Sequence, residues 1–142
     1  MDAHKYNMRL VHVEARFVDR AWQDGASALA KACETSGGEI TGDQLKMLLA
    51  RGERTLIRLD DVGKAVGWAV FRIDQLPNMR VFFITDLVAP NAGFPRFFGA
   101  VKELAASLGC SRVRCAAKEA QARLYTMKLG FAPVYSIMET VL

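Results

Sequence analysis

The stretch Ala122-Arg123-Leu124-Tyr125-Thr126-Met127-Lys128-Leu129-Gly130-Phe131 lies near the end of a chain of 142 residues. The spacing of its apolar residues predicts a helix over residues 119–129. Gly130 would end this helix, because glycine readily adopts the left-handed conformation that often follows a helix. The predicted inner stripe of the helix is Ala120, Leu124 and Met127.

The segments around this helix alternate between strand and helix. Residues 111–116 before it and residues 134–141 after it favour short strands. Further upstream, apolar residues recur at helical spacing from Phe94 to Leu108, which predicts a long helix. Residues 81–88 are apolar on both faces apart from two polar residues, as is typical of a central strand covered on both sides.

The first half of the chain predicts one strand, two helices and a hairpin. Residues 8–13 favour a strand and residues 20–33 a helix. Thr41, followed three positions later by Gln44, is a capping-box signature for a second helix. Residues 55–73 contain two β-rich runs with turn residues between them, which predicts an antiparallel hairpin. This order of elements indicates a mixed α/β fold, and we expect one domain over the whole chain.

The stretch quoted first resembles the pattern A-x-x-L-Y-x-x-x-G-F of the GNAT family of acyl-CoA N-acyltransferases. The resemblance is good over residues 55–142, whereas residues 1–54 match only in the order of their elements. It implies a GNAT-like fold with a central mixed, mostly antiparallel sheet flanked by about four helices. It also implies transfer of an acyl group from acetyl-CoA, or a related CoA thioester, to an amine acceptor.

The segment that would receive the cofactor departs from the family pattern. The family usually has Arg/Gln-x-x-Gly-x-Gly/Ala, whose backbone N–H groups cradle a pyrophosphate at a helix N-terminus. This chain reads Pro90-Asn91-Ala92-Gly93-Phe94-Pro95-Arg96, in which Pro95 lacks an N–H donor. The resemblance, with Arg96 as a counter-charge, assigns cofactor binding to Leu87, Val88, Asn91, Ala92, Gly93 and Arg96. The alternative is a catalytically inactive GNAT-like domain that acts as a protein-interaction or structural module, with Phe94 or Phe97 filling the groove.

Acyl transfer to an amine needs a base for the amine and an acid for the departing thiolate. The resemblance assigns the acid to Tyr125, which would point about 100° away from Leu124. The alternative is an amphipathic tyrosine that only packs. Asp86 is the candidate base, because it is an ionisable residue in an otherwise apolar strand. Its alternative is a structural carboxylate paired with a neighbouring arginine.

Composition limits the other classes of function. The formal net charge is +4, but Lys and Arg are scattered along the chain, so nucleic-acid binding is not favoured. Cys33, Cys110 and Cys115 lack the spacing of a zinc site, so we expect reduced thiols and no metal site. No apolar run approaches the roughly 20 residues that span a bilayer, and the N-terminus lacks the apolar core of a signal peptide. We therefore expect a cytoplasmic protein without a membrane partner, with a homodimer as a candidate assembly because of exposed strand edges.

Overall fold

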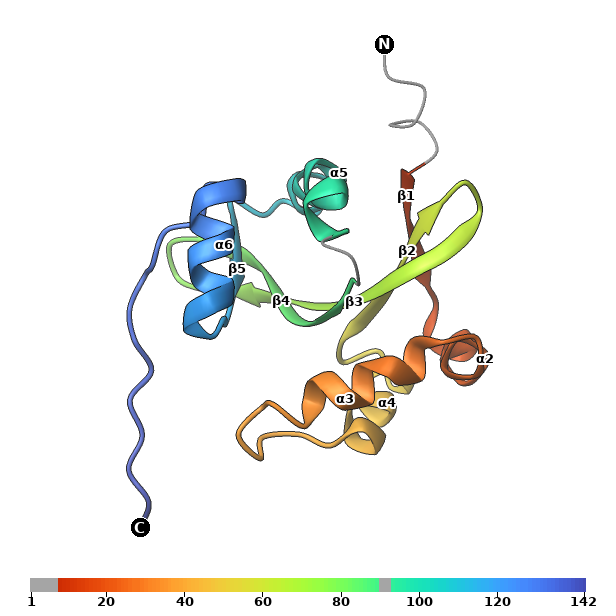
Figure 1. Cartoon of the computed structure of the whole chain (residues 1–142), viewed down its shortest axis with the longest axis horizontal. Coiled ribbons are helices and arrows are strands. Elements are labelled where there is room, and N and C mark those ends of the chain that lie inside the picture. Colours follow the sequence, from red (N-terminus) through yellow and green to blue (C-terminus); the bar gives the residue numbers. More distant parts are fainter. Residues whose placement is uncertain (1–7, 90–92) are drawn as a thin grey trace.

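The computed structural model describes residues 8–89 and 93–142, which form one twisted sheet with helices on both of its faces (Figure 1). Within these residues, the strands are β1 (Met8–Val13), β2 (Thr55–Asp61), β3 (Lys64–Gln75), β4 (Arg80–Val88) and β5 (Arg112–Cys115). The helices are η1 (Ala15–Phe17), α2 (Val18–Gln23), η2 (Ala26–Ala28), α3 (Leu29–Cys33), α4 (Gly42–Ala50), α5 (Phe94–Ser107) and α6 (Glu119–Leu129), where η marks a 3-10 helix. In this part of the chain, no helix combines the length and the apolar character needed to cross a bilayer.

The strands lie in the sheet in their order along the chain, from β1 to β5. The first three neighbouring pairs are antiparallel, and β4 and β5 are parallel. The predicted mixed, mostly antiparallel sheet is therefore confirmed. The predicted hairpin is also confirmed: Val62 and Gly63, between β2 and β3, have φ angles of 53° and 75°. Two residues with positive φ form the tight turn whose twist matches that of paired strands.

β4 contains a bulge and runs beyond its neighbour β5. The register between β3 and β4 shifts between Val70 and Phe71, where Thr85 is an extra residue on β4. A bulge of this kind bends a strand and changes the faces to which its side chains point. The parallel pairing with β5 ends at Ile84. The part of β4 from Thr85 to Val88 consequently continues past the end of β5.

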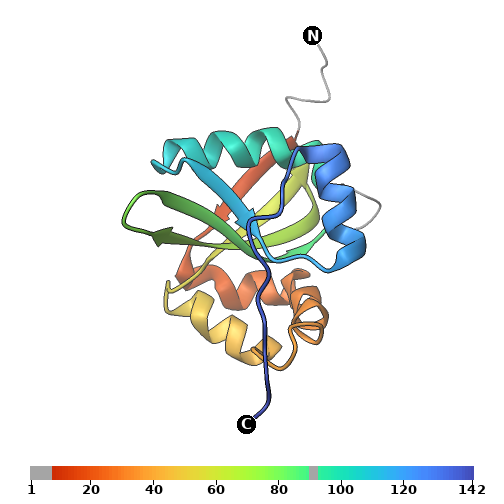
Figure 2. The ribbon, with the colours of Figure 1, turned by 90° about the vertical axis from the view of Figure 1, so that its left-hand side faces the viewer.

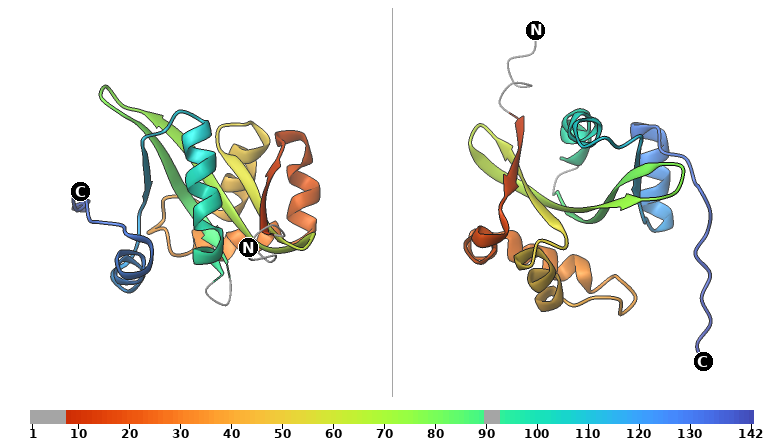
Figure 3. Two further views of the ribbon diagram at one scale, coloured as in Figure 1. Left: turned by 90° about the horizontal axis from the view of Figure 1, so that it is seen from above. Right: turned by 180° about the vertical axis from the view of Figure 1, so that it is seen from behind.

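Helices lie on both faces of the sheet (Figures 2 and 3), and the side chains between the helices and the sheet form two cores. The first lies between the sheet and α5 and includes Phe82 and Phe97. The second lies between the sheet and the helices α2, α3 and α4 and includes Leu29 and Trp68. The sheet is therefore covered on both faces, as the apolar run over residues 81–88 predicted.

The helical region between β1 and β2 differs in part from the prediction. The single helix predicted over residues 20–33 is wrong, because Asp24 and Gly25 separate α2 from η2 and α3. Gly25 has a φ of 129°, a conformation that interrupts a helix and that glycine adopts without steric strain. The capping box of α4 is confirmed, since the side chains of Thr41 and Gln44 each accept a hydrogen bond from the other residue's backbone N–H.

α6 ends at Leu129 and is followed by Gly130 with a φ of 73°, as predicted. The inner stripe predicted for this helix is wrong. Its three members are exposed, Met127 at 83%: Ala120, Leu124 and Met127. The half-buried side of α6 consists instead of Ala122, Tyr125 and Leu129. Two apolar stripes with helical spacing run along this helix, and apolar spacing alone cannot select the one that packs.

The final strand predicted over residues 134–141 is wrong as well. Residues 131–142 belong to no helix or strand. They run past the body of the molecule as an extended segment, drawn in dark blue (Figures 1 and 3). Their side chains beyond Phe131 are exposed, Ile137 at 83%. A strand requires a neighbour with which its backbone groups can pair, and apolar alternation alone does not supply one.

Candidate active site

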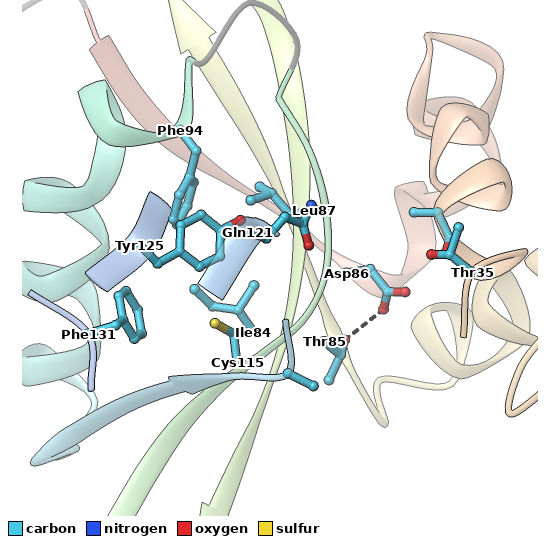
Figure 4. A pocket seen from close by; sticks show the side chains of 12 residues that line it. Thr35, Ile84, Thr85, Asp86, Leu87, Phe94, Cys115, Gln121, Tyr125 and Phe131 are labelled. Carbon is cyan, nitrogen blue, oxygen red and sulfur yellow. Dashed lines mark hydrogen bonds between the residues drawn. The ribbon is translucent and has the colours of Figure 1, made fainter. Parts of the chain in front are cut away.

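A pocket of about 160 Å³ opens where β4 runs beyond the end of β5 (Figure 4). Its lining comes from both faces of the sheet. Ala32 and Thr35 belong to the α3 side, whereas Phe94 and Tyr125 belong to α5 and α6 on the other side. Residues 84–87 of β4 lie between these two groups. The pocket therefore crosses the plane of the sheet at the point where the two parallel strands separate.

The carboxylate of Asp86 lines this pocket on the α3 side. The side chain of Asp86 is only 7% exposed, and the Thr85 hydroxyl donates to it a hydrogen bond of 2.7 Å (Figure 4). The Cys33 thiol lies 3.8 Å from its other oxygen, and a guanidinium nitrogen of Arg54 lies 3.6 Å from the oxygen that Thr85 contacts. One positive charge and two donors therefore compensate for the burial of the carboxylate. The ion pair matches the structural alternative, and the position in the pocket suits a base.

The thiols near this carboxylate are protonated. Burial raises the pKa of the Cys33 thiol to about 11, and the charge of Asp86 adds to the effect. Burial also raises the pKa of Cys115, which lines the same pocket. Cys33, Cys110 and Cys115 are all free cysteines. Among the described residues, no group of three or more His, Cys, Asp or Glu side chains is placed to hold a metal ion.

Tyr125 lines the opposite side of the pocket. Its ring centroid lies 6.2 Å from that of Phe94 and 5.7 Å from that of Phe131, so its side chain is held between two other rings. Burial raises the pKa of the Tyr125 phenol, and the nearby Cys115 adds to the shift. The phenol therefore keeps its proton at neutral pH. Phe94 forms part of the pocket wall beside it and leaves the pocket open.

The residues that the resemblance assigns to cofactor binding fall in two places. Leu87 lines the pocket that contains Asp86 and Tyr125. A second pocket, of about 460 Å³, is lined in part by Val88, Gly93 and Arg96. Arg96 donates a hydrogen bond of 2.9 Å to Asp61 at the end of β2, so its charge is shared with a carboxylate. Asn91 and Ala92 lie outside the described residues.

The arrangement of sheet and helices recurs in solved acetyltransferases, although no protein-family model and no curated protein matches this sequence. An aminoglycoside acetyltransferase from an uncultured soil metagenomic sample, solved with sisomicin, has a TM-score of 0.66 at 14% identity, covering 96% of this chain and 97% of its own. The aminoglycoside N-acetyltransferase AAC(6')-Iy in complex with CoA has a TM-score of 0.61 at 17% identity, with coverages of 95% and 94%. A ribosomal-protein-alanine N-acetyltransferase from Brucella melitensis biovar Abortus 2308 has a TM-score of 0.64 at 12% identity, with coverages of 94% and 99%. This chain has the GNAT acetyltransferase fold.

The GNAT fold brings several residues to the site that the sequence analysis did not select. The polar side chains that contact the Asp86 carboxylate or line its pocket without having been selected are Cys33, Thr35, Arg54, Thr85, Cys115 and Gln121. Cys33 lies 53 positions before Asp86, so no local pattern links the two residues. Thr85 had a local signal, because it is the polar neighbour of Asp86 in an apolar strand.

Proposed function

We propose that this chain is an N-acyltransferase that moves an acyl group from acetyl-CoA, or a related CoA thioester, to an amine. The observation that supports this most strongly is the single pocket lined by both Asp86 and Tyr125. The two side chains reach it from opposite faces of the sheet. A base and an acid on two sides of one small pocket suit a transfer between two reactants. The shared fold supports the same class of reaction, because structures with this fold include acetyltransferases, one of them bound to CoA.

Asp86 acts as the base in this proposal. The amine approaches from the α3 side and loses a proton to the carboxylate, either directly or through one water molecule. Its nitrogen then forms a bond to the acyl carbon. Contacts with Arg54, Thr85 and Cys33 fix the carboxylate in position, so that it is oriented to accept this proton.

Tyr125 acts as the acid on the opposite side. As the carbon–sulfur bond breaks, the sulfur keeps the bonding electrons and takes a proton from the phenol. The acylated nitrogen gives up its surplus proton, which returns to the phenolate through water, so the products are an amide and a thiol and the phenol is restored. The raised pKa of Tyr125 favours this role, because the proton remains on the phenol until the thiolate forms. The rings of Phe94 and Phe131 restrict the motion of the phenol, which lowers the cost of orienting it.

The free part of β4 would hold the thioester. Beyond the end of β5, Leu87 and Val88 offer backbone groups for strand-like hydrogen bonds to an extended pantetheine chain. A volume of about 160 Å³ suits the acyl end of the donor. The N-terminus of α5, which Gly93 precedes, would face the phosphates with its partial positive charge, although Pro95 removes one donor. The proposal places the reaction in the cytoplasm, where free cysteines stay reduced.

Calorimetric titration with acetyl-CoA and CoA, followed by an acetyl-transfer assay over a panel of amines, tests the proposal. We expect micromolar binding and turnover of at least one amine. Tyr125→Phe should retain CoA binding and lower kcat by about 100-fold or more, because the phenol no longer supplies its proton. Tyr135→Phe is the matched control, since Tyr135 is 70% exposed and lies outside both pockets.

Asp86→Asn keeps the shape of the side chain and removes its ability to accept a proton. We expect a loss in kcat of about 100-fold or more with CoA binding retained. The matched control is Asp74→Asn on β3, where the carboxylate pairs with Arg72 at 2.9 Å. Circular dichroism should confirm that each variant is folded. A folded protein that binds no CoA at millimolar concentration contradicts the proposal, and binding without transfer favours a GNAT-like binding module.

A further inference from the structure

The extended segment 134–142 has the character of a strand without a neighbour. Both of its alternating faces contain apolar side chains, with Val134 and Met138 on one and Ile137 and Val141 on the other. These side chains are exposed, from 60% for Val134 to 91% for Val141. An apolar strand that lies in the open is a template for pairing with another strand. Apolar character on both faces is typical of a strand covered on both sides, as in the interior of a sheet.

The same chain also presents a strand edge. β5 is the last strand of the sheet, and within the described residues no further strand pairs with its outer side. An open groove of about 800 Å³ runs along this edge, with walls from α5, β5 and residues 129–134. The charged residues among its lining are all basic: Lys102, Arg112 and Arg114. The groove therefore favours an apolar strand with a negative charge.

We propose that two copies of this chain form a dimer in which segment 134–142 of each copy pairs with β5 of the other. The segment and the groove complement each other in charge, because Glu139 is the single ionised side chain of the segment and the groove is basic. Among the described residues, each chain has an unpaired segment and, at β5, an exposed strand edge. A second copy therefore pairs both features at once in a closed two-fold arrangement, whereas an unrelated strand would pair only one of them.

The position at which segment 134–142 starts favours pairing with β5 of a second copy rather than with β5 of its own chain. Ala132, Pro133 and Val134 line the groove of their own chain, so the segment begins beside β5. It then runs past the body of the molecule without joining the sheet (Figures 1 and 2). The place along β5 thus stays open to the equivalent segment of a second copy. This inference does not depend on the proposed acyl transfer.

Light scattering coupled to size exclusion, with the full chain at several concentrations, gives the first test. We expect a mass of about twice the 15.7 kDa of one chain. Ile137→Lys places a positive charge in the segment, against a basic groove, and should weaken dimerisation by at least about tenfold. Met47→Lys is the matched control: Met47 is an apolar residue of α4 that is 49% exposed, and lysine is a good helix former. This control should remain a dimer.

Hydrogen exchange of the full chain identifies the surface that pairs. In the dimer, the backbone amides of residues 134–141 and those of β5 should exchange slowly, and both groups should exchange faster in Ile137→Lys at the same concentration. A chain shortened to residues 1–133 should be folded by circular dichroism and monomeric by light scattering. The proposal is overturned if the full chain is monomeric, whether its segment is exposed or folded onto its own β5. It is equally overturned if the shortened chain still forms the dimer.

Discussion

Gly67 of β3 lies against the end of β4, and Gly67→Ala is expected to destabilise the protein. A Cβ atom at position 67 would lie 2.5 Å from the carbonyl oxygen of Val88 and 3.3 Å from the Cα of Ala89. Both are backbone atoms, so a change of side-chain rotamer cannot relieve the contact. The Cδ1 atom of Leu59, at 3.1 Å, closes the other side. The alanine can therefore be accommodated only if the end of β4 moves away from β3.

The cost of this movement follows from the number of atoms added. One extra methyl group in a packed position costs about 1–3 kcal/mol in the free energy of unfolding. At about 3 °C per kcal/mol for a chain of this length, Tm should fall by about 3–9 °C. Gly99 of α5 provides the matched control, because a Cβ there meets no atom within 4 Å. Gly99→Ala should raise the free energy of unfolding by about 0.5–1 kcal/mol, since glycine loses more conformational freedom in a helix.

Urea and thermal unfolding, followed by circular dichroism, measure both variants against the unchanged chain. A CoA titration at a temperature where both variants are folded adds a functional measurement. Because Val88 lies on the edge proposed to hold pantetheine, Gly67→Ala should bind CoA more weakly than Gly99→Ala. If Gly67→Ala were as stable as the unchanged chain, the end of β4 would have to move without cost, and the argument from close packing would be refuted.

Two further measurements test the packing on the other face of the sheet. Thr41→Ala removes the side-chain acceptor of the α4 capping box and should lower the free energy of unfolding by about 1 kcal/mol in urea denaturation, whereas Thr41→Ser should lose much less. The Cys33 thiol has a pKa of about 11 in the folded chain against an ordinary value of 9.0, so the unfolded chain ionises first as pH rises. The stability present below pH 9 should therefore decline by about 2–3 kcal/mol as pH passes 11, and Cys33→Ala should show a smaller decline. An equal decline in both would contradict the assignment to Cys33.

Elements with a local cause could be predicted from the sequence. The capping box at Thr41 and the two-residue turn at Val62 depend on neighbouring residues alone, and both are present. The apolar run of β4 predicted a strand covered on both faces, which the two cores confirm. The errors arise where the outcome depends on distant parts of the chain. The inner side of α6 depends on how the helix meets the sheet, and the strand predicted over residues 134–141 depends on a partner.

The candidate site shows the same division. Tyr125 was selected by a motif and Asp86 by its polarity in an apolar strand, and both line one pocket. The residues that surround Asp86 could not be found in this way. Cys33 ends α3 and contacts Asp86 because α3 packs against β4, whereas Arg54 precedes β2 and reaches Asp86 from there. Contacts between elements so far apart in sequence leave no pattern in a single sequence.

The bulge at Thr85 explains why the side chain of Asp86 points to the face of the sheet that α3 covers. Side chains alternate between the faces of a regular strand, so Asp86 would share the face of Phe82 and Ile84 and enter the apolar core beneath α5. The extra residue shifts the alternation by one position. Leu87 takes the place in the α5 core, and Asp86 turns to the opposite face, where the thiol of α3 contacts it. The same bulge therefore moves a carboxylate out of a core and places the proposed base, Asp86, opposite Tyr125.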